Sequence, residues 1–135
     1  MPGVSTKLFL ESFWQLVRYD IVCSLTGFGR VHAELCGYGV NRHPKRPASE
    51  ALLCEAISSA ACFYWKPVRC LQRSVAGARL LRNHGIPAEV VIGYRPKPFF
   101  SHAWIEVDGR VMNDSPLYQT RMTVLDRIGT QVFVK

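Results

Sequence analysis

The chain has 135 residues and a mass of 15.3 kDa, with 48% hydrophobic and 20% charged residues, which is typical of one globular domain and excludes a disordered protein. No apolar run approaches the roughly 20 residues of a membrane span, and the first residues lack a secretory signal, so we expect a cytoplasmic protein without a membrane span. The net charge of +7 favours an acidic partner, but the basic residues are scattered and their one cluster, at Arg42, Lys45 and Arg46, is broken by prolines, which argues against nucleic-acid binding.

The first predicted element is a helix over residues 6 to about 26, ended by Gly27. Its apolar stripe is expected to pack on the rest of the domain. The stripe consists of Phe9, Phe13 and Leu16. Trp14 and Tyr19 lie off this stripe, and aromatic side chains are enriched at interfaces. We therefore expect Trp14 and Tyr19 to be candidates for docking a partner protein.

Two further helices follow a predicted linker. The Gly, Asn, Pro and basic residues of 37–47 indicate the linker. Ser49 is a good N-cap for a helix that runs to about Phe63. Another helix is expected from about Arg69 to Asn83, because Gly85 and a proline soon after it form a clear stop signal.

The hydrophobic period then changes to that of strands. Strands are predicted over 88–94, 102–107 and 110–114, with a turn at 96–98 and a last strand at 131–134. The rest of the tail from residue 115 has no clear pattern. Helices followed by a short antiparallel sheet predict an α+β domain.

The cysteines are odd in number and include no C-x-x-C pair. They are Cys23, Cys36, Cys54, Cys62 and Cys70. We expect reduced thiols that are mostly buried, with Cys54 and Cys62 in the core. No metal site is expected, because His32, Cys36 and His43 lack a fourth ligand and a standard zinc spacing.

Three residues of the second half form a candidate catalytic triad. Cys70 lies in the first turn of a predicted helix, where free N–H groups, the helix dipole and the neighbouring Arg69 favour a thiolate. The same amides would stabilise an oxyanion. His102 would serve as the base and Asp114 as the acid that orients it.

The hairpin around Asp108-Gly109 leaves two registers open. A two-residue loop places His102 opposite Ser115, so that Asp114 points to the other face of the sheet. A three-residue loop over 107–109 places His102 opposite Asp114. The triad hypothesis requires the second register, which Gly109 at the third loop position permits.

Each of these residues also has a structural interpretation. Cys70 could be a packed thiol, and the protein would then be a small basic binding module without catalysis. His84 is expected to interact with the last carbonyls of its helix. Gln72 is a candidate for an oxyanion-hole side chain. It is a weak one, because its position two residues into the helix is expected to point it away from the Cys70 sulfur.

Three motifs carry a resemblance to a known family. They are C-L-x-R-S from Cys70, L-L-R-x-x-G-I-P-A from Leu80, and H-A-W-I-E-V-D-G from His102. In this order and spacing, over residues 70–114, the chain resembles the transglutaminase-like leader peptidases of lasso peptide biosynthesis. The resemblance implies a papain-like, transglutaminase-like core with Cys70, His102 and Asp114 as its triad.

The resemblance also implies a reaction and its partners. Family members remove the leader from a ribosomally made precursor, so that a lasso cyclase closes a ring on the freed N-terminus. No metal or organic cofactor is implied. The chain is expected to be one domain over 1–135, with a helical segment and linker at 1–48 and the catalytic core at 49–135. It is similar to the split form, which works with a separate leader-recognition protein.

The aromatic residues Trp104 and Tyr94 are candidates for lining the substrate groove, although aromatic strand residues are as often core. The triad alone does not separate leader cleavage from another acyl transfer, such as transglutamination, or from amide hydrolysis on a different substrate.

Overall fold

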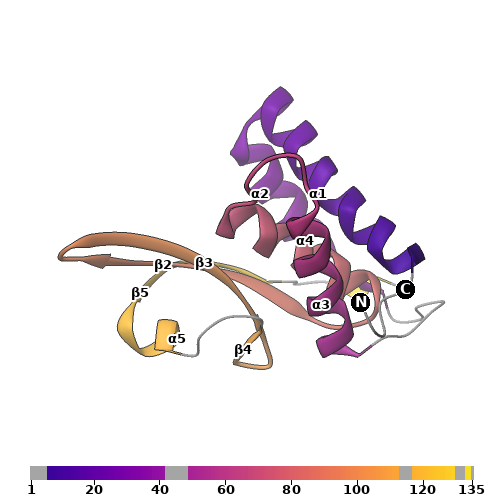
Figure 1. Cartoon of the computed structure of the whole chain (residues 1–135). Helices are drawn as coiled ribbons and strands as arrows, with labels where there is room; N and C mark the ends of the chain where they lie inside the picture. The colour runs from indigo at the N-terminus through magenta and orange to yellow at the C-terminus, as the bar shows by residue number, and fades with distance from the viewer. Residues whose placement is uncertain (1–5, 42–48, 113–116, 130–132, 135) are drawn as a thin grey trace.

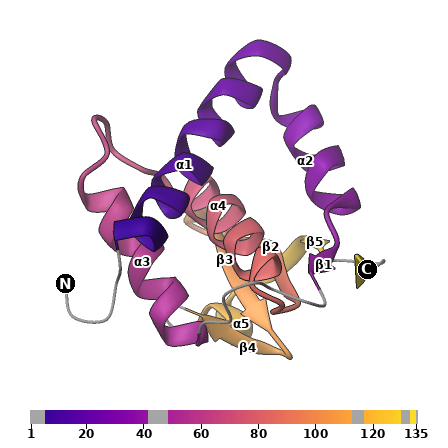
Figure 2. The ribbon, with the colours of Figure 1, turned by 90° about the vertical axis from the view of Figure 1, so that its right-hand side faces the viewer.

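A computed structural model describes residues 6–41, 49–112, 117–129 and 133–134 of the chain. Its first two helices, α1 (Thr6–Thr26) and α2 (Phe28–Gly37), form the V visible in Figure 2. The predicted helix and its end at Gly27 are confirmed, since Gly27 has φ of 82°, a conformation that glycine adopts without strain. The separate helix α2 was not predicted, and it restarts directly after this glycine.

The next two helices confirm the capping signals. In α3 (Glu50–Cys62), the Ser49 hydroxyl accepts a hydrogen bond of 3.1 Å from the backbone N–H of Leu52. In α4 (Cys70–Asn83), the chain leaves the helix through Gly85, whose φ is 88°. Both helices therefore begin and end within one or two residues of the predicted positions.

An antiparallel sheet with the strand order β4-β3-β2-β5 follows the helices. Its strands are β2 (Ala88–Pro96), β3 (Phe99–Val107), β4 (Arg110–Met112) and β5 (Thr123–Ile128). This arrangement confirms the predicted α+β class. Sequence patterns missed α5 (Leu117–Arg121) and β5.

A separate two-stranded parallel pair joins β1 (Val40–Asn41) to β6 (Phe133–Val134), so a short strand lies within the linker predicted at 37–47. The predicted strand at 131–134 is thus found in its last two residues, and residues 131 and 132 lie outside the described part of the chain. The proposed division of the chain at residue 48 stays a prediction. No described helix combines the length and apolarity needed to cross a membrane.

The sheet separates two hydrophobic clusters, because alternate side chains of a strand point to opposite faces. Helices α1 to α4 lie on one side of the sheet and α5 on the other (Figure 1). Ile105 belongs to the larger cluster, on the helical side, where its Cδ1 atom lies 2.7 Å from the point that a Cβ on Gly77 would occupy. Trp104 belongs to the smaller cluster, with Val91 and Met122.

The β3–β4 hairpin has a two-residue loop. Val107 pairs with Arg110, and Glu106 pairs with Val111. The three-residue loop that the triad hypothesis requires is therefore wrong. The reason is local: Asp108 and Gly109 both have positive φ, 52° and 79°. That is the geometry of a type I′ turn, whose twist matches the flanking strands and which Asp-Gly favours.

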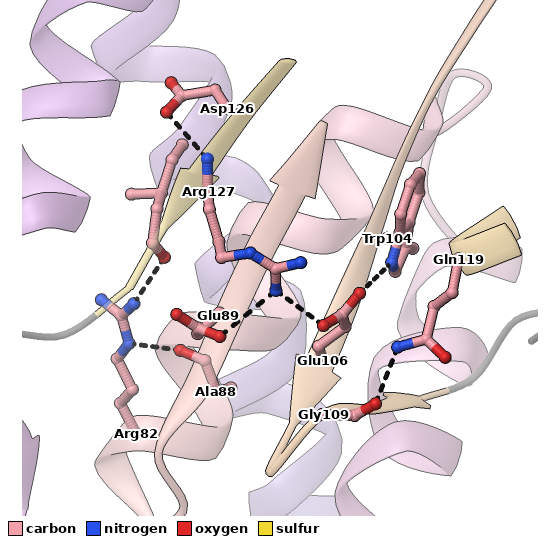
Figure 3. A network of polar contacts seen from close by, with 10 residues as sticks. Arg82, Ala88, Glu89, Trp104, Glu106, Gly109, Gln119, Asp126 and Arg127 are labelled. Atoms are coloured by element: carbon pink, nitrogen blue, oxygen red, sulfur yellow. Dashed lines mark hydrogen bonds and ion pairs between the residues drawn. The ribbon is translucent and has the colours of Figure 1, made fainter. Parts of the chain in front are cut away.

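Arg82 joins the end of α4 to three other segments. Its side chain is fully buried (0% exposed). The guanidinium donates to the carbonyls of Leu35 and Tyr38 at the end of α2, at 2.6 and 2.9 Å. It also donates to the carbonyls of Ala88 and Ile128, at 2.9 and 3.1 Å (Figure 3). One cation thus satisfies main-chain acceptors of α2, β2 and β5 together.

Candidate functional site

Cys70 is the first residue of α4, as predicted, and Arg69 is its N-cap. The first backbone hydrogen bond of the helix runs from the N–H of Arg73 to the carbonyl of Arg69, at 3.0 Å. The N–H groups of Cys70, Leu71 and Gln72 precede this bond, and the positive end of the helix dipole lies among them. The half-buried thiol thus lies where a thiolate or an oxyanion is electrostatically favoured.

A hollow of about 490 Å³ lies beside Cys70, between α1 and the segment that leads into α4. Its wall includes the chain neighbours of Cys70, Arg69 and Leu71, and Tyr19 of α1. Burial, followed by interactions with Cys23, Asp20 and Cys70, raises the pKa of Tyr19 to about 12. Tyr19 therefore keeps its proton at neutral pH. Of the two residues predicted to dock a partner, Trp14 is exposed, whereas Tyr19 belongs to the wall of this hollow.

Asp20 holds this wall together. Its carboxylate accepts hydrogen bonds from the Tyr64 hydroxyl and from Gln72 Nε2 at 3.1 Å, and Lys66 Nζ lies 2.9 Å away. Burial acts to raise the pKa of Asp20, but the hydrogen bonds from these three groups outweigh it and lower the pKa. The carboxylate is therefore charged at neutral pH and fixes α1 against the start of α4.

Gln72 is buried and directed toward α1. Besides Asp20, its Nε2 group donates to the carbonyl of Leu16 at 3.1 Å. Both contacts lie on the α1 side, so the Gln72 amide serves to hold two helices together. This placement does not favour the weak oxyanion-hole prediction for its side chain.

His102 lies on β3, paired with Gly93 of β2. Its ring stacks on Tyr118 of α5, with centroids 4.2 Å apart and planes at 29°, and Trp104 lies at 6.2 Å. These rings are on the face of the sheet that carries Trp104, whereas α4 packs on the face that carries Ile105. These ring contacts do not bring His102 and Cys70 together. Asp114 lies outside the described residues, so the triad stays a prediction.

A second pocket, of about 350 Å³, opens next to His102. It is lined by Phe100 and Tyr118, both ring neighbours of His102, and by Arg95, Leu117, Arg121 and Met122.

Of the two predicted groove residues, Trp104 is not part of this wall. Only 1% of Trp104 is exposed, and its Nε1 donates to Glu106 Oε2 at 2.8 Å. The expectation that Trp104 lines a groove is therefore corrected: its ring fills the core beneath Gly93. Tyr94 pairs with Ser101 and points to the helical side of the sheet, and its role in a groove stays a prediction.

Glu106 joins Trp104 to a network of charged side chains. Its other oxygen, Oε1, accepts a hydrogen bond from Arg127 Nη1 at 2.7 Å, and the same nitrogen lies 3.5 Å from Glu89 Oε1 (Figure 3). Burial acts to raise the pKa of Glu106, but hydrogen bonds from Arg127, Trp104 and Gln119 outweigh it and lower the pKa. The strands β2, β3 and β5 are thus joined by a charged network.

The thiols are more exposed than predicted. All five are free, but only Cys54 is buried. The expectation that Cys62 belongs to the core is wrong, because Cys62 is the last residue of α3 and is exposed there. Cys36 is also exposed, and its Sγ lies 3.6 Å from Nδ1 of His32.

The other two histidines in the described residues each lie beside a carboxylate. His84 Nε2 lies 2.8 Å from Glu11 Oε1 of α1, a contact that sequence patterns did not predict. His32 Nε2 lies 2.8 Å from Asp126 Oδ2. Within the described ranges no group of three or more potential ligands could hold a metal ion. His43 lies outside those ranges.

Comparisons with known proteins agree with the motif-based expectation. A family model of the transglutaminase-like superfamily matches residues 15–127, which is most of the chain. The chain is also 44% identical over 59 residues to the microcin J25-processing protein McjB of Escherichia coli. Those residues are 44% of this chain and 28% of that protein, so the match spans well under two thirds of the relative. No solved structure matches the chain.

Proposed function

Because the chain belongs to the transglutaminase-like superfamily, we propose that it is a cysteine peptidase that removes the leader from a lasso peptide precursor. The similarity to a microcin J25-processing protein carries this proposal. The position of Cys70 at the start of α4 supports it, since that is where a helix best stabilises a thiolate.

In the proposed reaction, the Cys70 thiolate attacks the carbonyl carbon at the junction of leader and core. The first amides of α4 stabilise the oxyanion. His102 in its protonated form gives a proton to the departing core amine, which leaves the leader as a thioester on Cys70. Water activated by His102 then hydrolyses the thioester, and Asp114 orients the His102 ring. The reaction uses no metal and no organic cofactor.

The proposal makes a geometric demand on His102. The ring must come within hydrogen-bonding distance of Cys70 Sγ, whereas its aromatic contacts are on the other face of the sheet. The proposed reaction therefore requires the His102 ring to reach the face of the sheet on which α4 packs.

The proposed partners follow from the reaction. The substrate is the leader–core junction of the precursor, and the hollow of about 490 Å³ beside Cys70 is the place we assign to the peptide. A separate leader-recognition protein would present the leader, and a lasso cyclase would use the freed N-terminus.

The test is mass spectrometry of a leader–core peptide incubated with the protein and its recognition partner. We expect cleavage at one bond, its loss in Cys70→Ala, and its retention in the matched control Cys62→Ala. His102→Ala and Asp114→Ala are expected to reduce cleavage strongly. Cleavage that survives Cys70→Ala would exclude the nucleophile, and an amine adduct in place of cleavage would indicate another acyl transfer.

A further inference from the structure

A second arrangement of cysteine, histidine and aspartate lies away from Cys70. Cys36 and His32 are one turn apart on α2, with Cys36 Sγ 3.6 Å from His32 Nδ1. On the other side of the ring, His32 Nε2 lies 2.8 Å from Oδ2 of Asp126 of β5. The three groups form a series with the imidazole in the middle, and they do not converge on one point as metal ligands would.

The partners of the ring determine its tautomer. An ionised carboxylate only accepts hydrogen bonds, so opposite Asp126 the proton of a neutral His32 ring belongs on Nε2. Nδ1 then has its lone pair toward Cys36 and accepts a hydrogen bond from the thiol. Asp126 is itself held, since its other oxygen accepts from the backbone N–H of Arg127 at 2.8 Å (Figure 3). The Phe28 and His32 rings form a T-shaped pair, with centroids 6.2 Å apart.

We propose that Cys36 is an activated thiol that undergoes exchange with small-molecule disulfides, with His32 as its base and Asp126 as the group that orients His32. The side chain is exposed, so a small disulfide reaches it. The proposal is independent of the peptidase function, because none of its residues belongs to the Cys70 site.

Charges around Cys36 act in both directions. The thiol lies in the last turn of α2, where the helix dipole disfavours an anion. Arg82 acts in the opposite direction. Its guanidinium donates to the carbonyl of Leu35, the residue before Cys36, so its positive charge lies at the same end of α2.

The exchange begins when His32 Nδ1 takes the proton of Cys36, and the resulting thiolate attacks one sulfur of the disulfide. A sulfur–sulfur bond to Cys36 forms as the bond within the reagent breaks. The departing half of the reagent leaves as a thiolate and takes a proton from the His32 imidazolium. The departing sulfur of the reagent is reduced from the disulfide to the thiol level, and Cys36 is oxidised to the same extent as it enters a mixed disulfide with the other half.

The test uses glutathione disulfide and peptide mass spectrometry to follow mixed-disulfide formation at each cysteine at pH 7. Cys62 is the matched control, since it is exposed at a helix end in the same protein. We expect Cys36 to react about tenfold faster than Cys62. His32→Ala should remove this advantage and leave the Cys62 rate unchanged, and Asp126→Asn should reduce it in part.

Cys54 reports on folding in the same experiment, because it is buried and reacts only when the chain opens. If Cys54 becomes reactive in His32→Ala, that variant has opened the fold. The rate at Cys36 is then read in Asp126→Asn, provided that Cys54 stays unreactive there. Equal rates at Cys36 and Cys62 in the unmodified protein would overturn the proposal. A Cys36 rate that both substitutions leave unchanged would do so as well.

Discussion

Replacing Arg82 with methionine tests the idea that one buried cation holds α2, β2 and β5 together. Methionine has a similar length and apolar stem but donates no hydrogen bond. The four carbonyls that Arg82 satisfies are main-chain groups. No side-chain substitution removes them, so this case differs from a buried ion pair whose two partners are replaced together.

The expected loss follows from those four acceptors. The carbonyl of Leu35 keeps the backbone N–H of Tyr38 at 3.2 Å, whereas each of the other three loses the Arg82 donor at a cost of about 1 kcal/mol or more, so Arg82→Met should lower the free energy of unfolding by about 3 kcal/mol. Domains of this kind are stable by about 5–15 kcal/mol in total. Arg82→Lys keeps a charge but reaches fewer acceptors, and we expect it to lose about half as much.

Urea unfolding followed by circular dichroism measures the difference. Arg30→Met is the matched control: it removes an arginine whose side chain is 63% exposed and whose ion pair with Glu34 lies on the helix surface. Its effect should stay below about 1 kcal/mol. A loss in Arg82→Met as small as in this control would refute the reasoning.

Three further substitutions probe other contacts. Because hydrogen bonds lower the pKa of Asp20 in the fold despite its burial, the ionised Asp20 stabilises the fold above about pH 4, and this stabilisation is lost as the pH falls. In urea unfolding, the free energy of unfolding should therefore decrease less between pH 7 and about pH 3 in Asp20→Asn than in the unmodified protein, and an equal decrease would contradict this. Gly77→Ala places a Cβ 2.7 Å from Ile105 Cδ1, so it should lower the free energy of unfolding by about 1–3 kcal/mol and lower the melting temperature with it. Adding Ile105→Val removes Cδ1 and should restore most of the lost stability, and a double variant that melts no higher than Gly77→Ala would argue against the clash. Glu106→Gln leaves Arg127 without its buried carboxylate and should cost about 2–4 kcal/mol by urea unfolding, so near-normal stability would show that the network contributes little.

Local signals predicted α1, α3 and α4 well. Ser49, Gly27 and Gly85 each act within a few residues of themselves, through a cap or a positive φ. The elements that sequence patterns missed depend on distant contacts instead. In β5, only Ile128 is buried, so this edge strand shows no alternation to detect and forms because β2 offers it hydrogen-bonding partners.

In the candidate site, too, local features could be predicted and features that depend on distant contacts could not. The position of Cys70 at a helix start could be predicted because helix caps are local. The side of the sheet that His102 faces depends on strand register and on packing against Tyr118, which the sequence does not encode within a short window. The Asp108-Gly109 pair permitted two registers, and the positive φ of both residues selected the one that the triad hypothesis did not use.

Helix α4 connects the stability of the fold to the proposed chemistry. Its start carries Cys70, its middle approaches β3 so closely at Gly77 that a side chain does not fit, and its end is fixed through Arg82. The position of the thiol is therefore determined by contacts up to 12 residues away on the same helix. Arg82→Met should lower both stability and cleavage, and its cleavage should recover when a ligand or lower temperature restores the folded fraction. Cys70→Ala should abolish cleavage while leaving the urea midpoint nearly unchanged, because a half-buried thiol contributes little packing. A Cys70→Ala variant that loses stability and activity together would mean that the thiol is part of the core and not a nucleophile.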